Sequence, residues 1–192
     1  MQEDYKKWSN KFINELERIN MNWDEYFLGV CKTIASNSKC LSRKIGAIIV
    51  RDKSIISTGY NGPPRGVPPC FTRCNDDQNF IKELNTKSIT YDQIHPKCPR
   101  QVLGFKSGEK VDICIAGHAE RNAIVNAAKN GVCVKDSIMY MTCPIPCTPC
   151  LVEIINSGIK EIVVTDMSYY DQMGEYLIKQ SGLKVRLNNS IL

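Results

Sequence analysis

The chain has 192 residues, of which 43% are hydrophobic and 23% are charged, and it contains ten cysteines but only two histidines. That length and composition are typical of one globular domain, and they exclude both a disordered protein and one whose apolar runs could span a bilayer. The net charge of +5 comes from residues scattered along the chain without a basic run, which argues against a polynucleotide partner.

The N-terminal part of the chain is predicted to be helical. Residues 3–19 carry aromatic and aliphatic side chains at helical spacing, which predicts an amphipathic helix. A second helix is predicted over Trp23–Asn37, with Asn22 as its N-cap. The first residues lack the basic and then apolar order of a secretory signal, so we expect a cytoplasmic protein, or one in the host cytoplasm if it is viral.

Two short strands and a long irregular segment come next. The runs Ile45–Val50 and Ile55–Tyr60 are rich in β-branched residues and flank Arg51-Asp52-Lys53, which predicts a hairpin. Residues 61–117 contain many prolines, glycines and cysteines, so we expect a long insertion without secondary structure of its own. A loop of that length in a compact domain is usually functional or held in place by another group.

The last third alternates helices and strands. Helices are predicted over 119–130, 147–156 and 171–180, each closed by a glycine, and strands over 137–142, 161–165 and 184–187. This order predicts an α/β fold in which helices cover the faces of a partly parallel sheet. The expected organisation is an N-terminal helical extension, residues 1–21, followed by one domain over residues 22–192.

Two segments carry residues suited to metal chemistry, His118-Ala119-Glu120 and Pro146-Cys147-Thr148-Pro149-Cys150, each at the start of a predicted helix. In a reducing compartment cysteines are rarely in disulfides, so metal ligation is the leading use for them. His118, Cys147 and Cys150 would give zinc three ligands and leave a fourth position for water, as in catalytic zinc sites. Glu120 would then be placed to move a proton without being a ligand.

The pair Cys147 and Cys150 alone would also fit a thioredoxin-like redox site or a four-ligand structural zinc. Neither alternative requires a glutamate two residues after a histidine at a helix start. The joint pattern, H-x-E followed by P-C-x-x-C, is the signature of zinc-dependent deaminases. Residues 22–192 are therefore predicted to form a zinc-dependent deaminase domain.

The chain resembles the deoxycytidylate (dCMP) deaminases of bacteria and phages, in the cytidine deaminase superfamily, over nearly all of residues 22–187. The matching stretches are Trp23-Asp24-Glu25-Tyr26-Phe27, Ser38-Lys39-Cys40, Arg43-Lys44-Ile45-Gly46-Ala47, Gly59-Tyr60-Asn61-Gly62, Ser107-Gly108-Glu109 and His118-Ala119-Glu120-Arg121-Asn122-Ala123-Ile124. The Gly-Tyr-Asn-Gly stretch adds most, because the zinc signature is shared by deaminases of bases, nucleosides, nucleotides and polynucleotides.

The resemblance implies a three-layer α/β/α sandwich with a mixed, about five-stranded sheet. It also implies that zinc-bound hydroxide attacks carbon 4 of dCMP, while Glu120 moves the proton to N3 and then to the departing ammonia. The product, dUMP, would supply thymidylate synthesis. A homo-hexamer, activation by dCTP and inhibition by dTTP are implied in the same way.

One loop departs from the family pattern. An extra residue lies between Thr142 and Pro146-Cys147, in a loop that should border the base pocket. Cys143 lies in this loop, and we interpret it as a packed residue because Cys147 and Cys150 already satisfy the family spacing.

Four further cysteines are candidates for a second, structural zinc: Cys40, Cys70, Cys98 and Cys114. They occupy positions where similar bacterial enzymes carry cysteines, and a metal there would hold the insertion in place. Cys74 and His95 could substitute for one of the four. The alternative is that they are reduced cysteines buried as small hydrophobic side chains.

Four residues are candidates for contacts to substrate or effector. Asn61 can both donate and accept hydrogen bonds, although Asn-Gly is also a common turn pair. Arg65 and Lys129 are candidate partners for a phosphate or an effector, with solvated surface charge as the alternative. Tyr169, like its neighbour Tyr170, follows a strand at the sheet edge where α/β proteins bind ligands.

Two other functions are compatible with parts of this sequence. The first is deamination of another cytosine nucleotide, dCTP or CMP. The second is a non-catalytic, zinc-stabilised nucleic-acid-binding protein on the same fold. The intact Glu120 and the three ligands favour an enzyme, and we expect no polynucleotide and no membrane partner.

Overall fold

The structure, a computed structural model, describes residues 22–94, 97–106 and 108–188. The helix predicted over residues 3–19 lies outside these ranges. The first described helix, α2 (Trp23–Ser36), begins as predicted, because the side chains of Asn22 and Glu25 each accept a hydrogen bond from the other's backbone N–H. None of the helices in the described ranges is long and apolar enough to cross a bilayer.

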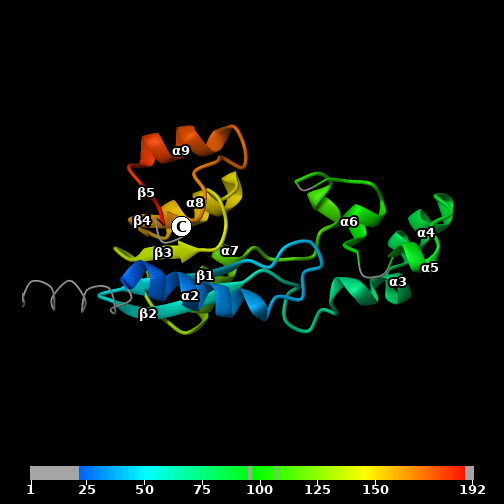
Figure 1. Cartoon of the computed structure of the whole chain (residues 1–192), viewed down its shortest axis with the longest axis horizontal. Helices are drawn as coiled ribbons and strands as arrows, with labels where there is room; N and C mark the ends of the chain where they lie inside the picture. The colour runs from blue at the N-terminus through cyan, green and yellow to red at the C-terminus, as the bar shows by residue number, and fades with distance from the viewer. Residues whose placement is uncertain (1–21, 95–96, 107, 189–192) are drawn as a thin grey trace, which may run out of the picture.

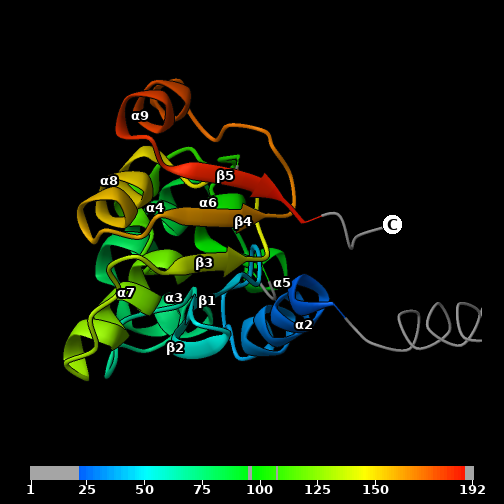
Figure 2. The same cartoon turned by 90° about the vertical axis from the view of Figure 1, so that its left-hand side faces the viewer.

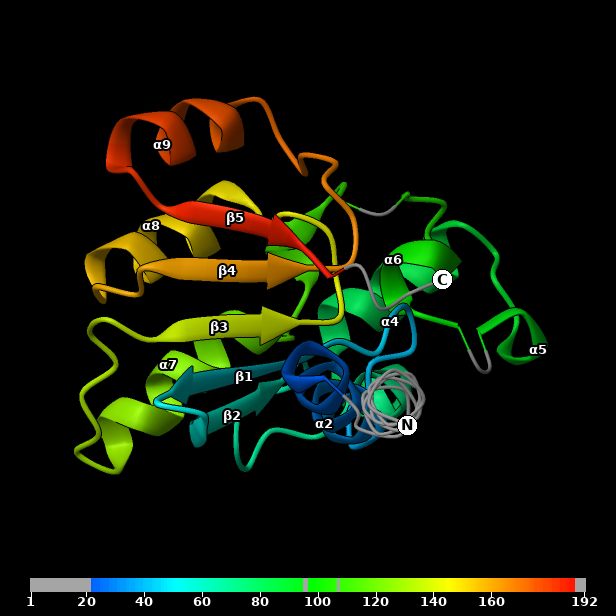
Figure 3. The same cartoon turned by 60° about the vertical axis from the view of Figure 1, so that its left-hand side comes forward.

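Five strands form one mixed sheet in the order β2-β1-β3-β4-β5, which Figure 3 shows nearly face on. Their bounds are β1 (Gly46–Arg51), β2 (Ser54–Tyr60), β3 (Ile138–Met141), β4 (Glu161–Val164) and β5 (Lys184–Leu187). Strand β1 is antiparallel to both β2 and β3, whereas β3, β4 and β5 run parallel. The predicted hairpin is confirmed, and its turn residues Asp52 and Lys53 both have positive φ, as a tight hairpin turn requires.

Helices cover both faces of the sheet (Figure 2). On one face, Phe27 and Cys31 of α2 pack against Ile48 and Tyr140. On the other face lie α7 (Ala119–Lys129), α8 (Thr148–Asn156) and α9 (Met173–Ser181), whose apolar side chains join those of β1, β3 and β4 in the larger core. This confirms the predicted three-layer α/β/α sandwich.

The segment between β2 and α7 is more regular than predicted, and it lies beside the sheet as a separate lobe (Figure 1). Its helices are η1 (Cys70–Thr72), α3 (Arg73–Asp76), α4 (Gln78–Thr86), α5 (Tyr91–Ile94), α6 (Pro99–Val102) and η2 (Val111–Ile113). Phe80, Leu84 and Leu103 form a small buried core within this insertion lobe. The prediction that the insertion lacks secondary structure was therefore wrong, because these apolar side chains give short helices something to pack against.

The two ends of the insertion lobe meet at the start of α7. The Gly62 N–H donates to the Gly117 carbonyl at 3.1 Å, and the Gly117 N–H donates to the Gly62 carbonyl at 2.8 Å. The Asn122 side chain donates to the Tyr60 carbonyl at 2.8 Å from within the first turns of the helix. The lobe is thus closed at its base, immediately before His118.

Helix α7 lies against β2 at backbone contact, and Gly59 makes this approach possible. A Cβ at position 59 would lie 2.3 Å from both the Ala119 carbonyl oxygen and the Ala123 amide nitrogen. The Ser57 hydroxyl donates to the Ala123 carbonyl at 2.6 Å, which ties the same helix to the same strand. The position of α7 is therefore set by backbone atoms that cannot rotate out of the way.

We predict that Gly59→Ala lowers the free energy of unfolding by about 1–3 kcal/mol, because β2 and α7 must separate to admit one methyl group. The matched control is Gly29→Ala in α2, where an added Cβ meets no atom within 4 Å. That change should be neutral or raise stability by up to about 1 kcal/mol, since alanine favours a helix. Urea unfolding of both variants measures this, and equal effects would show that the contact at Gly59 is not limiting.

Candidate active site

Three side chains with metal-ligating atoms converge where the first turns of α7 and α8 meet. His118 is the N-cap of α7, Cys147 is the N-cap of α8, and Cys150 lies in the first turn of α8. The Nδ1 atom of His118 lies 3.3 Å from the Cys150 sulfur and 3.4 Å from the Cys147 sulfur. Among the described residues this is the one group of three such ligands whose atoms all lie within 4.8 Å of one another.

These distances fit a zinc ion. Zinc binds thiolate at about 2.3 Å and imidazole nitrogen at about 2.0–2.1 Å, so tetrahedral angles place the two ligand atoms about 3.5 Å apart. The two distances from His118 Nδ1 to the sulfur atoms therefore suit one ion bound through Nδ1. Three ligands leave one tetrahedral position for water or substrate.

The thiols also have the electrostatics of a metal site. The hydrogen bond from the Cys150 thiol, together with the neighbouring His118, lowers the pKa of Cys147 to about 4. That hydrogen bond and burial in turn raise the pKa of Cys150. One thiolate thus forms readily next to His118, whereas a second negative charge needs a cation to stabilise it.

Glu120 lies beside this group but is not part of it. Its side chain is only 4% exposed, and loss of hydration raises its pKa. The Cys143 thiol donates a long hydrogen bond, 3.8 Å, to its Oε1 atom. A carboxyl group that holds its proton more tightly than usual next to a metal site can both accept and return a proton near neutral pH.

A cavity opens beside His118, Cys147 and Glu120. Its wall is built from widely separated segments of the chain, including the loop before β1, the insertion lobe, the β3–α8 loop and the β4–α9 loop. Cys143 and Pro144 of the family-divergent loop line it, and so does Asn61 at the end of β2. The site is thus at the edge of the sheet to which the carboxyl end of β3 points.

The structure places Asn61, a predicted substrate-binding residue, in this cavity wall, where its amide group already has backbone partners. Its Oδ1 accepts from the Ile45 N–H at 2.8 Å, and its Nδ2 donates to the Arg43 carbonyl at 2.8 Å. The side chain is buried, with 7% exposed. Each amide atom retains a second hydrogen-bonding position, so Asn61 both shapes the loop before β1 and can contact a ligand.

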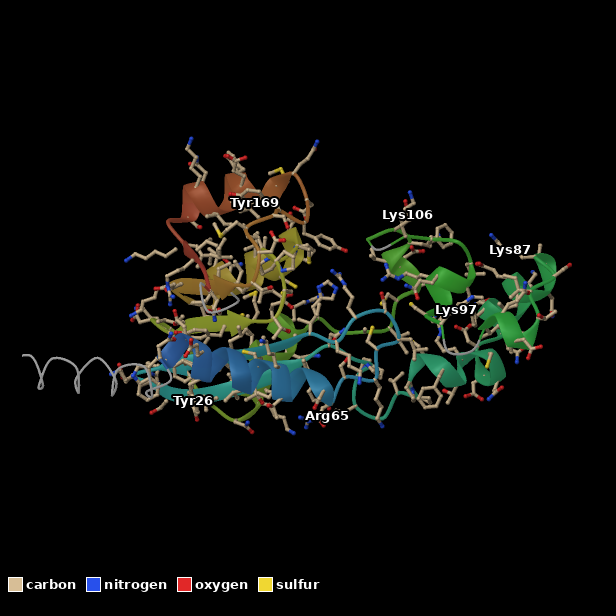
Figure 4. The ribbon with its side chains drawn as sticks, in the orientation of Figure 1. Tyr26, Arg65, Lys87, Lys97, Lys106 and Tyr169 are labelled. Carbon is tan, nitrogen blue, oxygen red and sulfur yellow. The ribbon has the colours of Figure 1, made fainter. Side chains whose placement is uncertain are left out.

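The other substrate and effector candidates lie outside this cavity. Arg65 and Lys129 line a second, polar cavity, where the Arg65 guanidinium donates to the Asn126 side chain at 3.2 Å. Tyr169 is 46% exposed and lies on the opposite side of the molecule from Arg65 (Figure 4). Tyr170 lines the active-site cavity instead.

The fold brings the four cysteines predicted to hold a second metal near one another, but their sulfur atoms are not close enough to share one ion without rearrangement. Burial raises the pKa of the Cys70 thiol to about 11, and repulsion from Cys40, Cys98 and Cys114 adds to this rise. Sulfur atoms of these four do not come within 4.8 Å of one another as a group in the described residues. Cys40 and Cys114 also line the active-site cavity, and His95 lies outside the described residues.

The cavity contains two arginines to which the sequence assigned no role. Arg43 lies in the stretch Arg43-Lys44-Ile45-Gly46-Ala47, which matches the family pattern, and that match is a sequence signal for a functional role. Arg100 lies in α6 of the insertion lobe, and no local pattern distinguishes it from other surface charges. Its position follows from how the lobe folds back toward α7.

The comparisons with known proteins agree with this geometry. Residues 21–166 match the family model described as the cytidine and deoxycytidylate deaminase zinc-binding region. The deoxycytidylate deaminase of Mus musculus is 32% identical over 171 residues, which cover 86% of this chain and 79% of that protein. The deoxycytidylate deaminase of Schizosaccharomyces pombe is 32% identical over 170 residues, but the chain spans only 45% of its length.

Among solved structures, the dCMP deaminase of cyanophage S-TIM5 in complex with dCMP and dUMP aligns with a TM-score of 0.59. The alignment covers 88% of this chain and 99% of that one, at 24% sequence identity. This similarity supports the fold.

Proposed function

Because the chain belongs to the family of cytidine and deoxycytidylate deaminases, we propose that it deaminates dCMP hydrolytically to dUMP and ammonia. The observation that carries the proposal is the burial of Glu120 in one cavity with His118 and Cys147. Relatives named deoxycytidylate deaminases, and a similarly folded phage enzyme that binds dCMP and dUMP, support the choice of substrate. The product would supply thymidylate synthesis.

His118, Cys147 and Cys150 would hold a catalytic zinc ion, in keeping with the family description as a zinc-binding region. When bound, zinc lowers the pKa of a coordinated water molecule and so supplies a nucleophile near neutral pH. The two helix N-termini favour the thiolate forms of the ligands. The remaining steps fall to side chains of the chain itself.

Glu120 would accept a proton as water adds to carbon 4 of the cytosine ring. It would then deliver that proton to N3 and assist the departure of the amino group as ammonia. The raised pKa of the buried carboxyl group suits this exchange, because the group must be basic enough to take the proton and acidic enough to return it. The Cys143 thiol at 3.8 Å limits the directions in which the carboxyl can turn.

A second, structural zinc is proposed at Cys40, Cys70, Cys98 and Cys114, with Cys74 or His95 as substitutes. The electrostatic interaction of Cys70 with the other three supports it, since a four-cysteine set is typical of structural zinc. We also propose a cytoplasmic location, because a reducing compartment keeps cysteines available as metal ligands. Such a metal would tie the insertion lobe to the loop before β1.

Regulation by dCTP and dTTP and assembly as a homo-hexamer are part of the same proposal. The polar cavity at Arg65 and Lys129 supports an effector site, because two cations face it from different segments. It is separate from the active-site cavity, so an effector there would not compete directly with substrate.

Ammonia release from a panel of nucleotides tests the substrate. Zinc-replete protein should turn over dCMP faster than dCTP, CMP or deoxycytidine, with dCTP raising and dTTP lowering the rate. A matching loss of cytosine absorbance should accompany the ammonia. Absence of dCMP turnover with and without either effector would rule out the proposed activity.

Metal analysis separates the two proposed zinc sites. Wild-type protein purified without added metal should contain about two zinc ions per chain, and Cys70→Ser and Cys150→Ser about one each. Cys133→Ser is the control, because Cys133 is exposed and belongs to neither site. About one zinc ion in the wild type, lost in Cys150→Ser but kept in Cys70→Ser, would exclude the structural site.

A further inference from the structure

Two arginines from different parts of the chain line the cavity that holds His118 and Glu120. Arg43 belongs to the loop before β1, and Arg100 belongs to α6 of the insertion lobe. Glu120 is the one carboxylate among the described residues that line the cavity. Away from the metal ligands, the cavity is therefore positively charged.

Neither arginine is neutralised within the described part of the chain, where no carboxylate comes within ion-pair distance of either one. Arg100 donates from Nη1 to the Glu109 carbonyl at 2.9 Å, while its Nε–H is buried and has no hydrogen-bond partner among the described residues. The Glu109 carboxylate is already engaged by the Lys106 N–H at 2.7 Å. A buried donor without an acceptor is costly, so the site gains when a ligand supplies an oxygen.

Arg43 is held in a different way. Its guanidinium carbon lies 5.9 Å from the centroid of the Tyr170 ring, which orients the group by a cation–π contact and leaves its N–H donors available. Tyr170 in turn touches the insertion lobe, since a Cβ at Gly108 would lie 3.1 Å from its hydroxyl oxygen. The contacts from Arg43 to Tyr170 and from Arg100 to Glu109 thus bring both cations to one cavity.

We propose that Arg43 and Arg100 together bind the 5′-phosphate of the nucleotide substrate while its base lies against Glu120. This inference rests on the proposed function and adds the residues that make a phosphate necessary for recognition. Guanidinium groups donate two parallel hydrogen bonds to phosphate oxygens, and two of them balance a phosphate dianion. A nucleoside without phosphate would leave both cations unpaired, which a site of this kind discriminates against strongly.

The experiment compares Arg43→Gln, Arg100→Gln and the charge-retaining Arg43→Lys and Arg100→Lys with wild-type protein. For each, kcat and KM are measured with dCMP, and inhibition constants with dUMP and with deoxyuridine, which lacks the phosphate. Each glutamine variant should raise the KM for dCMP and the inhibition constant of dUMP by roughly 10- to 100-fold. The inhibition constant of deoxyuridine should change less than threefold, and each lysine variant should recover part of the loss.

Arg51→Gln is the control, because it removes an arginine outside this cavity whose guanidinium donates to the Cys133 carbonyl. Unchanged binding of dUMP in both glutamine variants would overturn the assignment. An equal weakening of dUMP and deoxyuridine would also overturn it, because a general disturbance of the cavity affects both ligands. Failure of wild-type protein to deaminate dCMP would instead count against the proposed function. In that case, direct measurement of the affinities for dUMP and deoxyuridine would still test whether the two arginines bind the phosphate.

Discussion

The site depends on one constraint, the meeting of the N-termini of α7 and α8 within the reach of a single ion. His118 Nδ1 has to lie about 3.5 Å from two sulfur atoms, so an error of one ångström in either helix would open the site. The fold meets this requirement with backbone contacts. Gly59 brings β2 against Ala119 and Ala123, and the paired hydrogen bonds of Gly62 and Gly117 fix the residue immediately before His118.

The insertion lobe acts on the site through the same junction. Its two ends are joined at Gly62 and Gly117, so a segment with its own small core is attached directly to the start of α7. From there it returns Arg100 and Cys114 to the wall of the active-site cavity. A single α/β sandwich would leave that side of the cavity open to solvent. The lobe therefore contributes charge and enclosure, while the sandwich contributes Glu120 and the three proposed metal ligands.

The convergence of His118, Cys147 and Cys150 could be predicted from the sequence, because their spacings match a known pattern. Glu120 follows His118 by two residues and Cys150 follows Cys147 by three. The relative position of the side chains in each pair is therefore set within one helical turn. The helices of the insertion lobe do not follow from local patterns alone, because the burial of Phe80 and Leu84 is completed by Leu103 from another helix of the lobe. Arg100 was missed for the same reason, since its place in the cavity depends on long-range contacts that no local pattern encodes.

The role of Glu120 is tested most directly by ammonia release from dCMP with wild-type and Glu120→Gln protein of equal measured zinc content. Glutamine keeps the size of the side chain and removes its capacity to carry a proton, and it replaces no metal ligand. We expect zinc content to be unchanged and kcat to fall by roughly 100- to 10,000-fold. A Glu120→Gln protein that retained its zinc and turned over dCMP within tenfold of the wild-type rate would contradict this mechanism.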